Sequence, residues 1–171
     1  ALDRPRDVRW DPDLGGGSLW DVGCYPLNFS RYMLGAEPEE VFATQVVGPS
    51  GIDESFTAQM RFPEGVTAQF DSGFRSQFRM HMEIVGSEAS LYLPMAFKPE
   101  MRSHIVLSQG NDTRKIVVEG NLLYLDEVEE MASRILDDKP ALLPLADSRA
   151  NIRAIMALYD SASLGRPVTL P

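Results

Sequence analysis

The chain has little of three things that define large classes of protein: cysteine, positive charge and long apolar runs. Among its 171 residues the one cysteine is Cys24, so no disulfide can form within the chain, and a reducing cytoplasm is the expected compartment. Lysine and arginine number 16 against 25 acidic residues, and the net charge of −9 argues against nucleic acid or an anionic membrane as a partner. No apolar run reaches the roughly 18 residues of a membrane span.

Further absences argue against particular chemistries. Neither His81 nor His104 has a histidine or cysteine partner at ligand spacing, so we expect no metal site. The lack of a Gly-x-Ser-x-Gly motif removes support for a serine hydrolase. The sequence also lacks G-x-G-x-x-G, the phosphate-binding turn of dinucleotide-binding domains, and its three consecutive glycines do not supply that spacing. The function of the chain must therefore be inferred from other residues.

The most informative stretch begins with the glycines at 15–17 and runs to Asn28. Asp21, Tyr25 and Asn28 are spaced four and three apart, so they share one face if the segment is helical. A carboxylate one turn from a phenol suits proton handling beside a substrate, and the glycines would let the backbone approach a ligand closely. The alternative is an ordinary glycine loop entering a helix, with a surface hydrogen bond between Asp21 and Tyr25. Spacing alone leaves both interpretations open.

Periodicity divides the chain into helical and extended parts. A helix is predicted over 17–34, ending at Gly35, with Pro26 kinking it just after Tyr25. From 41 to 118, apolar and polar residues alternate with a period of two, which indicates hairpin-linked antiparallel strands. The clearest of these strands are 56–62, 66–70, 78–84, 89–93, 104–107 and 114–118.

Two amphipathic helices are predicted at the end of the chain. The first covers about 122–136, and the second begins at an N-cap formed by Asp147 and stops at Gly165. The order of elements predicts an α+β fold, with one mostly antiparallel open sheet and helices packed on its apolar face. We expect a single domain over 1–171, in which 1–14 form a linker with a first short strand around 8–10. The carboxylates at 37, 39 and 40 are interpreted as solvated or as charges at a helix N-terminus.

The stretch from Val8 to Asn28 resembles the start of the C-terminal domain of the glucose–fructose oxidoreductase / inositol dehydrogenase / MocA (Gfo/Idh/MocA) family. The family pattern there reads roughly GGG-x-x-x-D-x-G-x-[H or Y], and Tyr25 matches its tyrosine variant. That variant is similar to the branch containing glucose–fructose oxidoreductase and the dimeric dihydrodiol and xylose dehydrogenases. The resemblance continues through 83–86 and 148–162, so it covers nearly the whole chain. It implies a fold like the C-terminal domain of dihydrodipicolinate reductase.

The resemblance implies a function as well. The chain would be the substrate-binding and oligomerising domain of an NAD(P)-dependent oxidoreductase that acts on a sugar, polyol or dihydrodiol. Family members begin with a Rossmann dinucleotide-binding domain that carries G-x-G-x-x-G and a later lysine. Neither is found here, and Lys98, which no glutamate precedes, is not equated with that lysine. We therefore expect an excised domain, inactive alone, whose parent binds NAD or NADP mainly through the missing part.

By the same resemblance, Tyr25 is expected to be the catalytic residue and to contact the cofactor, while Asp21 orients the tyrosine or the substrate. Arg9, Trp10 and Asn28 are expected to bind substrate; the alternative for Trp10 is that it anchors the linker. Free tyrosine has a pKa of about 10 and is a poor base near neutrality, so the missing lysine would have to lower it. Tyrosine in place of histidine favours aldoses or dihydrodiols over inositols.

Two expectations concern partners. The polar face of the sheet is either solvated or, as in the resembled family, packed against a second subunit, and we favour an isologous homodimer. A competing hypothesis makes the chain a non-catalytic assembly or carbohydrate-binding module. The residues assigned to the polar face are Thr57, Gln59, Arg61, Thr67, Gln69, Asp71, Arg79, His81 and Glu83.

Overall fold

The computed structural model describes residues 7–171, which divide into two compact units. The first unit comprises the chain up to Gln77 together with Leu143–Pro171, and the second is Phe78–Leu142. Both contain an antiparallel sheet, and helices accompany each, so the predicted α+β class is confirmed. The predicted strands nevertheless lie in two four-stranded sheets rather than in one. The part of the predicted linker that precedes residue 7 falls outside the described residues.

The sheet of the first unit has the order β3-β2-β1-β8, and all of its neighbours are antiparallel. The alternation predicted for 56–62 is confirmed, because every second side chain from Phe56 to Phe62 is buried. A short 3₁₀ turn, Pro63–Gly65, joins β2 to β3, as the Pro-Glu-Gly sequence predicts. The strands are β1 (Glu40–Val47), β2 (Asp53–Arg61), β3 (Thr67–Gly73) and β8 (Val168–Thr169).

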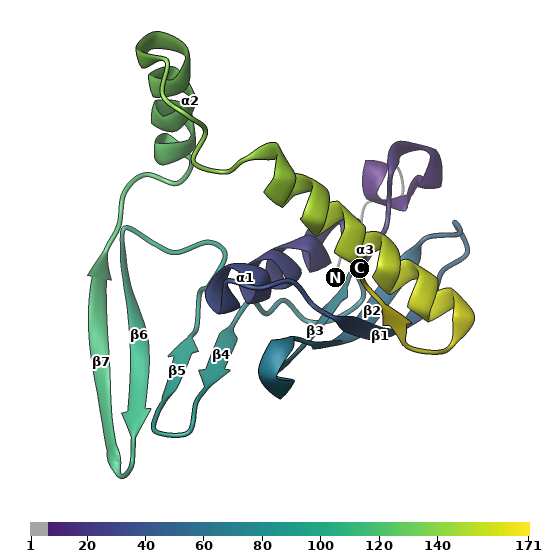
Figure 1. Cartoon of the computed structure of the whole chain (residues 1–171), viewed down its shortest axis with the longest axis horizontal. Helices are drawn as coiled ribbons and strands as arrows, with labels where there is room; N and C mark the ends of the chain where they lie inside the picture. The colour runs from purple at the N-terminus through teal and green to yellow at the C-terminus, as the bar shows by residue number, and fades with distance from the viewer. Residues whose placement is uncertain (1–6) are drawn as a thin grey trace. The chain divides into compact units, whose positions relative to one another are not determined.

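Helices α1 (Cys24–Leu34) and α3 (Leu145–Leu164) pack together, and α3 lies along β1 (Figure 1). Their apolar sides and the inner face of the sheet form one core, which confirms the predicted helix-covered face for this unit. A buried hydroxyl joins the layers: Ser161 accepts a hydrogen bond from the N–H of Ala43 and donates one to the carbonyl of Arg166. The core residues are Leu19, Leu27, Val41, Ala43, Phe56, Ala58, Met60, Phe62, Ala154, Ile155, Ala157 and Leu158.

A buried arginine ties α1 to the start of α3. The guanidinium of Arg31, whose side chain is 3% exposed, donates two hydrogen bonds of 2.7 Å to the carboxylate of Glu37. It also donates to the carboxylate of Asp147 at 2.9 Å and to the amide oxygen of Asn151 at 3.1 Å. The side chain of Glu37 is 52% exposed, which agrees with its interpretation as solvated, and it also pairs with Arg31. Asp147 is not the N-cap of α3, since that position belongs to Pro144.

The second unit contains a sheet of order β4-β5-β6-β7 and helix α2. The predicted strand 78–84 begins only at Met82, because 74–81 lie outside both ladders. Phe74, directly after β3, is buried and packs against the ring of Trp10, and the pairing of β3 with β2 ends at Gly73. The elements are β4 (Met82–Val85), β5 (Ser90–Leu93), β6 (Arg102–Gln109), β7 (Asp112–Glu119) and α2 (Leu125–Asp137).

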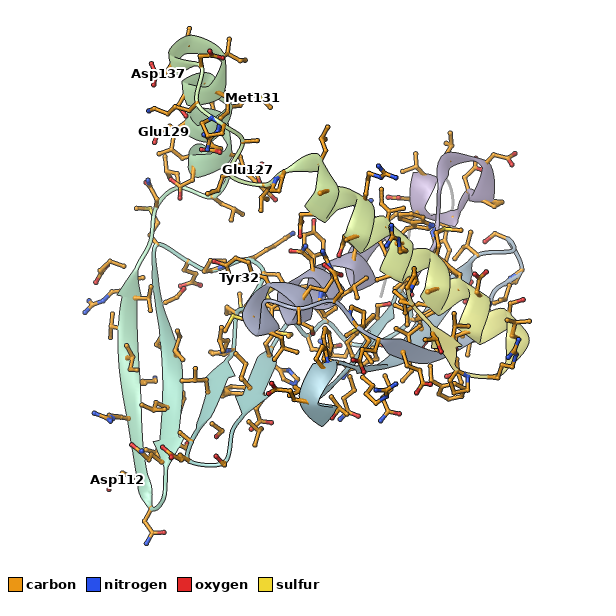
Figure 2. The ribbon with its side chains drawn as sticks, viewed as in Figure 1. Tyr32, Asp112, Glu127, Glu129, Met131 and Asp137 are labelled. Carbon is orange, nitrogen blue, oxygen red and sulfur yellow. The ribbon has the colours of Figure 1, made fainter. Side chains whose placement is uncertain are left out.

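Helix α2 is amphipathic, as predicted, but it buries none of its residues. Met131 is 62% exposed, and Figure 2 shows it on α2 among Glu127, Glu129 and Asp137. The helix is supported locally by the hydrogen bond from Arg134 to Glu130, one turn apart. The expectation that both C-terminal helices cover a sheet face thus holds for α3 and fails for α2.

The short strand predicted around 8–10 is wrong, because Val8–Trp10 form a 3₁₀ turn. The side chain of Asp7 accepts a hydrogen bond from the N–H of Arg9, and the N–H of Asp11 donates to the carbonyl of Val8. Capping of this kind by aspartate competes with extended structure. Asp11 in turn caps a second 3₁₀ turn, Pro12–Leu14, which leads into the glycines.

Candidate active site

Two of the three glycines, Gly16 and Gly17, lie close against other parts of the chain. A Cβ atom on Gly16 would stand 2.7 Å from the carbonyl oxygens of Arg9 and Asp11. Gly17 has φ of +120°, and a Cβ there would collide with the carboxylate of Asp53. Protein atoms fill the space beside these two glycines, whereas a Cβ atom on Gly15 would meet nothing within 4 Å, so the close approach of a ligand at Gly15 stays a prediction. The N–H groups of all three glycines donate to carbonyl oxygens earlier in the chain and are therefore not free to bind a phosphate.

The helix predicted over 17–34 has two parts. Leu19–Gly23 form a π-helix that continues directly into α1, and Gly35 ends α1 with φ of +58°. Pro26 lies in the first turn of α1, where a missing N–H is tolerated. It therefore stands close to the point at which the π-helix changes to an α-helix.

Tyr25 and Asn28 lie on the exposed side of this segment. Tyr25 is 54% exposed and Asn28 is also exposed, whereas Pro26 and Leu27 are buried against the core. Asp21, within the π-helix, is partly buried. The segment thus places the carboxylate at the edge of the core and the phenol beyond it, which is an arrangement open to a substrate.

Arg9 holds Asp21. Its Nε donates to Oδ2 of Asp21 at 2.7 Å, and its Nη1 donates to Oδ1 of Asp7 at 3.0 Å. The bond to Asp21, and then the one to Asp7, raises the pKa of Arg9 above its ordinary value, so the guanidinium stays charged. The structure thus brings together two residues that the sequence singled out separately. Two of the side-chain donors of Arg9 are thus already used by carboxylates. Direct substrate binding by Arg9 stays a prediction.

Trp10 packs within the first unit. Its ring meets that of Phe74 edge to face at 5.3 Å between centroids, and the guanidinium of Arg75 lies 4.9 Å above it. Arg75 is itself bonded to the carboxylate of Glu54 at 2.8 and 2.9 Å. Aromatic and cation–π contacts of this kind stabilise packing. They favour the interpretation of Trp10 as an anchor over that of a substrate-binding residue.

Cys24 lies between the two candidate catalytic residues, but its thiol is not activated. Burial, followed by the negative charge of Asp21, raises the pKa of Cys24 above its usual value. The protonated sulfur is a weak nucleophile, in agreement with the interpretation of Cys24 as a small packing residue.

Two residues that sequence reasoning missed are polar groups in the core of the first unit. Asp53, at the start of β2, accepts hydrogen bonds from Ser18, from the N–H of Leu19 and from Tyr159. Arg31 forms the cluster described above. The signal that could have found them is a charged residue at a position where the amphipathic pattern expects an apolar one. Periodicity alone gives the same picture when the pattern is assigned one residue out of register. Among residues 7–171, no group of histidine, cysteine or acidic side chains could hold a metal ion, and no helix is long and apolar enough to cross a membrane.

The fold is of the α+β class, and its glycine-led helical segment carries an acid, Asp21, and a phenol, Tyr25. The family model for the GFO/IDH/MocA C-terminal domain matches residues 1–92, and the chain belongs to this family. The resemblance found in the sequence is therefore confirmed.

The curated relatives include a D-xylose 1-dehydrogenase (NADP(+)) of Haloferax volcanii, 29% identical over 96% of this chain and 51% of that protein. The chain thus spans about half the length of the curated relatives it matches most fully. An aldose–aldose oxidoreductase from Caulobacter crescentus superimposes with a TM-score of 0.88 at 24% identity, covering 99% of this chain and 52% of the other. A 3-ketoreductase from Actinomadura kijaniata, in complex with NADP and TDP-benzene, gives 0.87 at 23% identity, covering 92% and 50%. These two structures show the same fold.

Proposed function

We propose that the chain is the substrate-binding domain of an NAD(P)-dependent oxidoreductase acting on a sugar, polyol or dihydrodiol. The observation that carries the proposal is the exposed phenol of Tyr25 one turn beyond Asp21, which Arg9 holds by a 2.7 Å bond. The names of the relatives support a carbohydrate substrate and favour NADP over NAD. We place the whole protein in a reducing cytoplasm, which the single cysteine of this chain supports.

The residues of this chain would divide the work on a substrate hydroxyl. A bound NAD(P)⁺ supplies the hydride acceptor. Tyr25 takes the proton of the hydroxyl whose carbon gives up the hydride, so that the alcohol becomes a carbonyl. Asp21, fixed by the guanidinium of Arg9, orients the phenol or a neighbouring hydroxyl, and the amide of Asn28 offers both a donor and an acceptor to the sugar.

The proposal is tested by comparing the whole protein with this chain alone. We expect the whole protein to reduce NADP⁺ or NAD⁺ with one or more aldoses, polyols or dihydrodiols, measured by the absorbance of the reduced nicotinamide. The chain alone should give no turnover, because the dinucleotide would be held by the other half of the parent. A whole protein that binds sugars but reduces neither dinucleotide would instead support a carbohydrate-binding module.

We further propose that the chain forms a homodimer through the open face of the β3-β2-β1-β8 sheet. Six of the predicted polar residues, on β2 and β3, are exposed on this face, while Arg79, His81 and Glu83 belong to the other unit and do not contribute to it. Phe42 and Val46 of β1 are 37% and 63% exposed beside them, with Phe42 paired to Gln59. Polar residues with apolar groups among them are typical of protein interfaces.

Replacing Phe42 with lysine in the whole protein should weaken this dimer by at least about tenfold, because each copy would bring an unpaired charge to a two-fold interface. Sedimentation velocity over a range of concentrations measures the change. Val66→Lys is the matched control, since Val66 is also exposed but lies in the turn region outside the strands. An unchanged dimer in the Phe42 variant would place the interface elsewhere.

A further inference from the structure

Asp53 is a carboxylate buried in the core of the first unit. The residue is 3% exposed, and both of its carboxylate oxygens are occupied. Ser18 Oγ and the N–H of Leu19 each donate to Oδ2 at 2.8 Å, and the hydroxyl of Tyr159 donates to Oδ1 at 2.8 Å. Burying a carboxylate is costly unless its oxygens are hydrogen-bonded, so this residue has a role that an apolar side chain would not fill.

The helical segment that carries Asp21 and Tyr25 has no cap of its own. Ser18, at its N-cap position, has helical φ and ψ of −71° and −30°, and its side chain makes no capping bond within the segment. The first N–H groups of a helix need acceptors from elsewhere. Asp53 supplies one to Leu19 from a strand 34 residues away, and a carboxylate at that end is also favoured by the helix dipole.

The surroundings fix the carboxylate in place. Tyr159 reaches it from α3, and burial followed by the bond to Asp53 raises the pKa of Tyr159 well above its usual value, so the phenol stays a donor. The Ser18 hydroxyl donates its proton to Asp53. In the 3.1 Å contact between the two serine hydroxyls, Ser72 of β3 is therefore the donor and Ser18 the acceptor. The start of the segment is thus held by residues of β2, β3 and α3.

We infer that Asp53 is a positioning residue, whose buried carboxylate sets where Asp21 and Tyr25 stand relative to the substrate. The inference rests on the proposed function. Asp21 follows the anchored Leu19 within the π-helix, and Tyr25 lies about one turn further on. A shift of the helix start therefore moves both side chains, and a misplacement of about 1 Å costs roughly 100-fold in rate.

The test is Asp53→Ala in the whole protein, combined with Tyr25→Phe in a double-mutant cycle. Asp53→Ala should lower kcat by about 100-fold while dinucleotide affinity changes less than about twofold. In the Tyr25→Phe background the same change should cost less than about threefold, because there is no phenol left to position. A merely structural residue would give equal factors in both backgrounds.

Asp53→Asn provides the conservative rescue. The amide oxygen keeps both acceptor positions for Ser18 and Leu19, and the amide NH₂ can donate to the oxygen of Tyr159, so kcat should stay within about tenfold of the parent. The matched control is Ser161→Ala, which removes a fully buried hydroxyl of the same unit whose bonds among residues 7–171 go to Ala43 and Arg166. That variant should lose thermal stability and keep kcat.

If Asp53→Ala does not fold, Ser18→Ala decides, since it removes one of the three donors and should lower kcat about fivefold to tenfold. A folded Asp53→Ala or Ser18→Ala with kcat within threefold of the parent, or equal losses in both backgrounds, overturns the inference. Full activity of Tyr25→Phe would instead contradict the proposed function. If Tyr25→Phe lowers kcat and the Asp53 variants do not, only the inference about Asp53 is contradicted.

Discussion

Tyr25→Phe in the whole protein is expected to lower kcat by about 100- to 10,000-fold, the range for loss of a general acid–base group. The substitution removes one oxygen from a ring that is 54% exposed, so the fold should be preserved. The KM for the sugar should change much less than kcat, because the proton is exchanged in the chemical step and not on binding. Steady-state kinetics with saturating dinucleotide separate the two parameters.

The control lies on the same helix. Tyr32, on α1, is 76% exposed and is labelled in Figure 2, and Tyr32→Phe makes the same chemical change two turns beyond Tyr25. It should leave kcat unchanged. A Tyr25→Phe enzyme that keeps turnover within tenfold of the parent would remove Tyr25 from its assigned role, whatever the substrate.

Arg31→Ala is expected to cost about 3–5 kcal/mol of folding stability, as does removal of one partner from a buried ion pair. The guanidinium is almost fully enclosed and bonds Glu37, Asp147 and Asn151, so its loss leaves a cavity between α1 and α3 and two carboxylates without a counter-charge. Glu37 and Asp147 are 52% and 35% exposed at their side chains, and water access to them favours the lower end of the range. For a protein of this size the melting temperature should fall by roughly 6–12 °C.

Thermal unfolding followed by circular dichroism measures the effect of Arg31→Ala. The comparison is Arg102→Ala, which breaks a pair with Glu119 whose two side chains are more than 70% exposed, and which should cost less than about 1 kcal/mol. Arg31→Lys should also be destabilising, because an ammonium group cannot make the bidentate bond to Glu37. Equal melting temperatures for the two alanine variants would show that the Arg31 cluster contributes no more than a surface pair.

Local patterns predicted the local structure well. The alternation around Phe56 and Met60 predicted β2 and its buried face, and the glycines at 35 and 165 predicted where α1 and α3 end. Local capping also explains an error, because the hydrogen bond from the N–H of Arg9 to Asp7 selects a 3₁₀ turn where a strand was expected. In both cases the interactions that decide the outcome join residues close together in the sequence.

The sequence by itself therefore determined the family, the antiparallel α+β class and the segment that bears Asp21 and Tyr25, since each depends on spacing along the chain. Only the tertiary structure decided the division into two sheets and the two polar groups in the core. Asp53 meets Ser18 across 35 residues and Tyr159 across 106, and Arg31 meets Asp147 across 116. Such contacts exist only after the strands and helices have packed, so no short-range pattern encodes them.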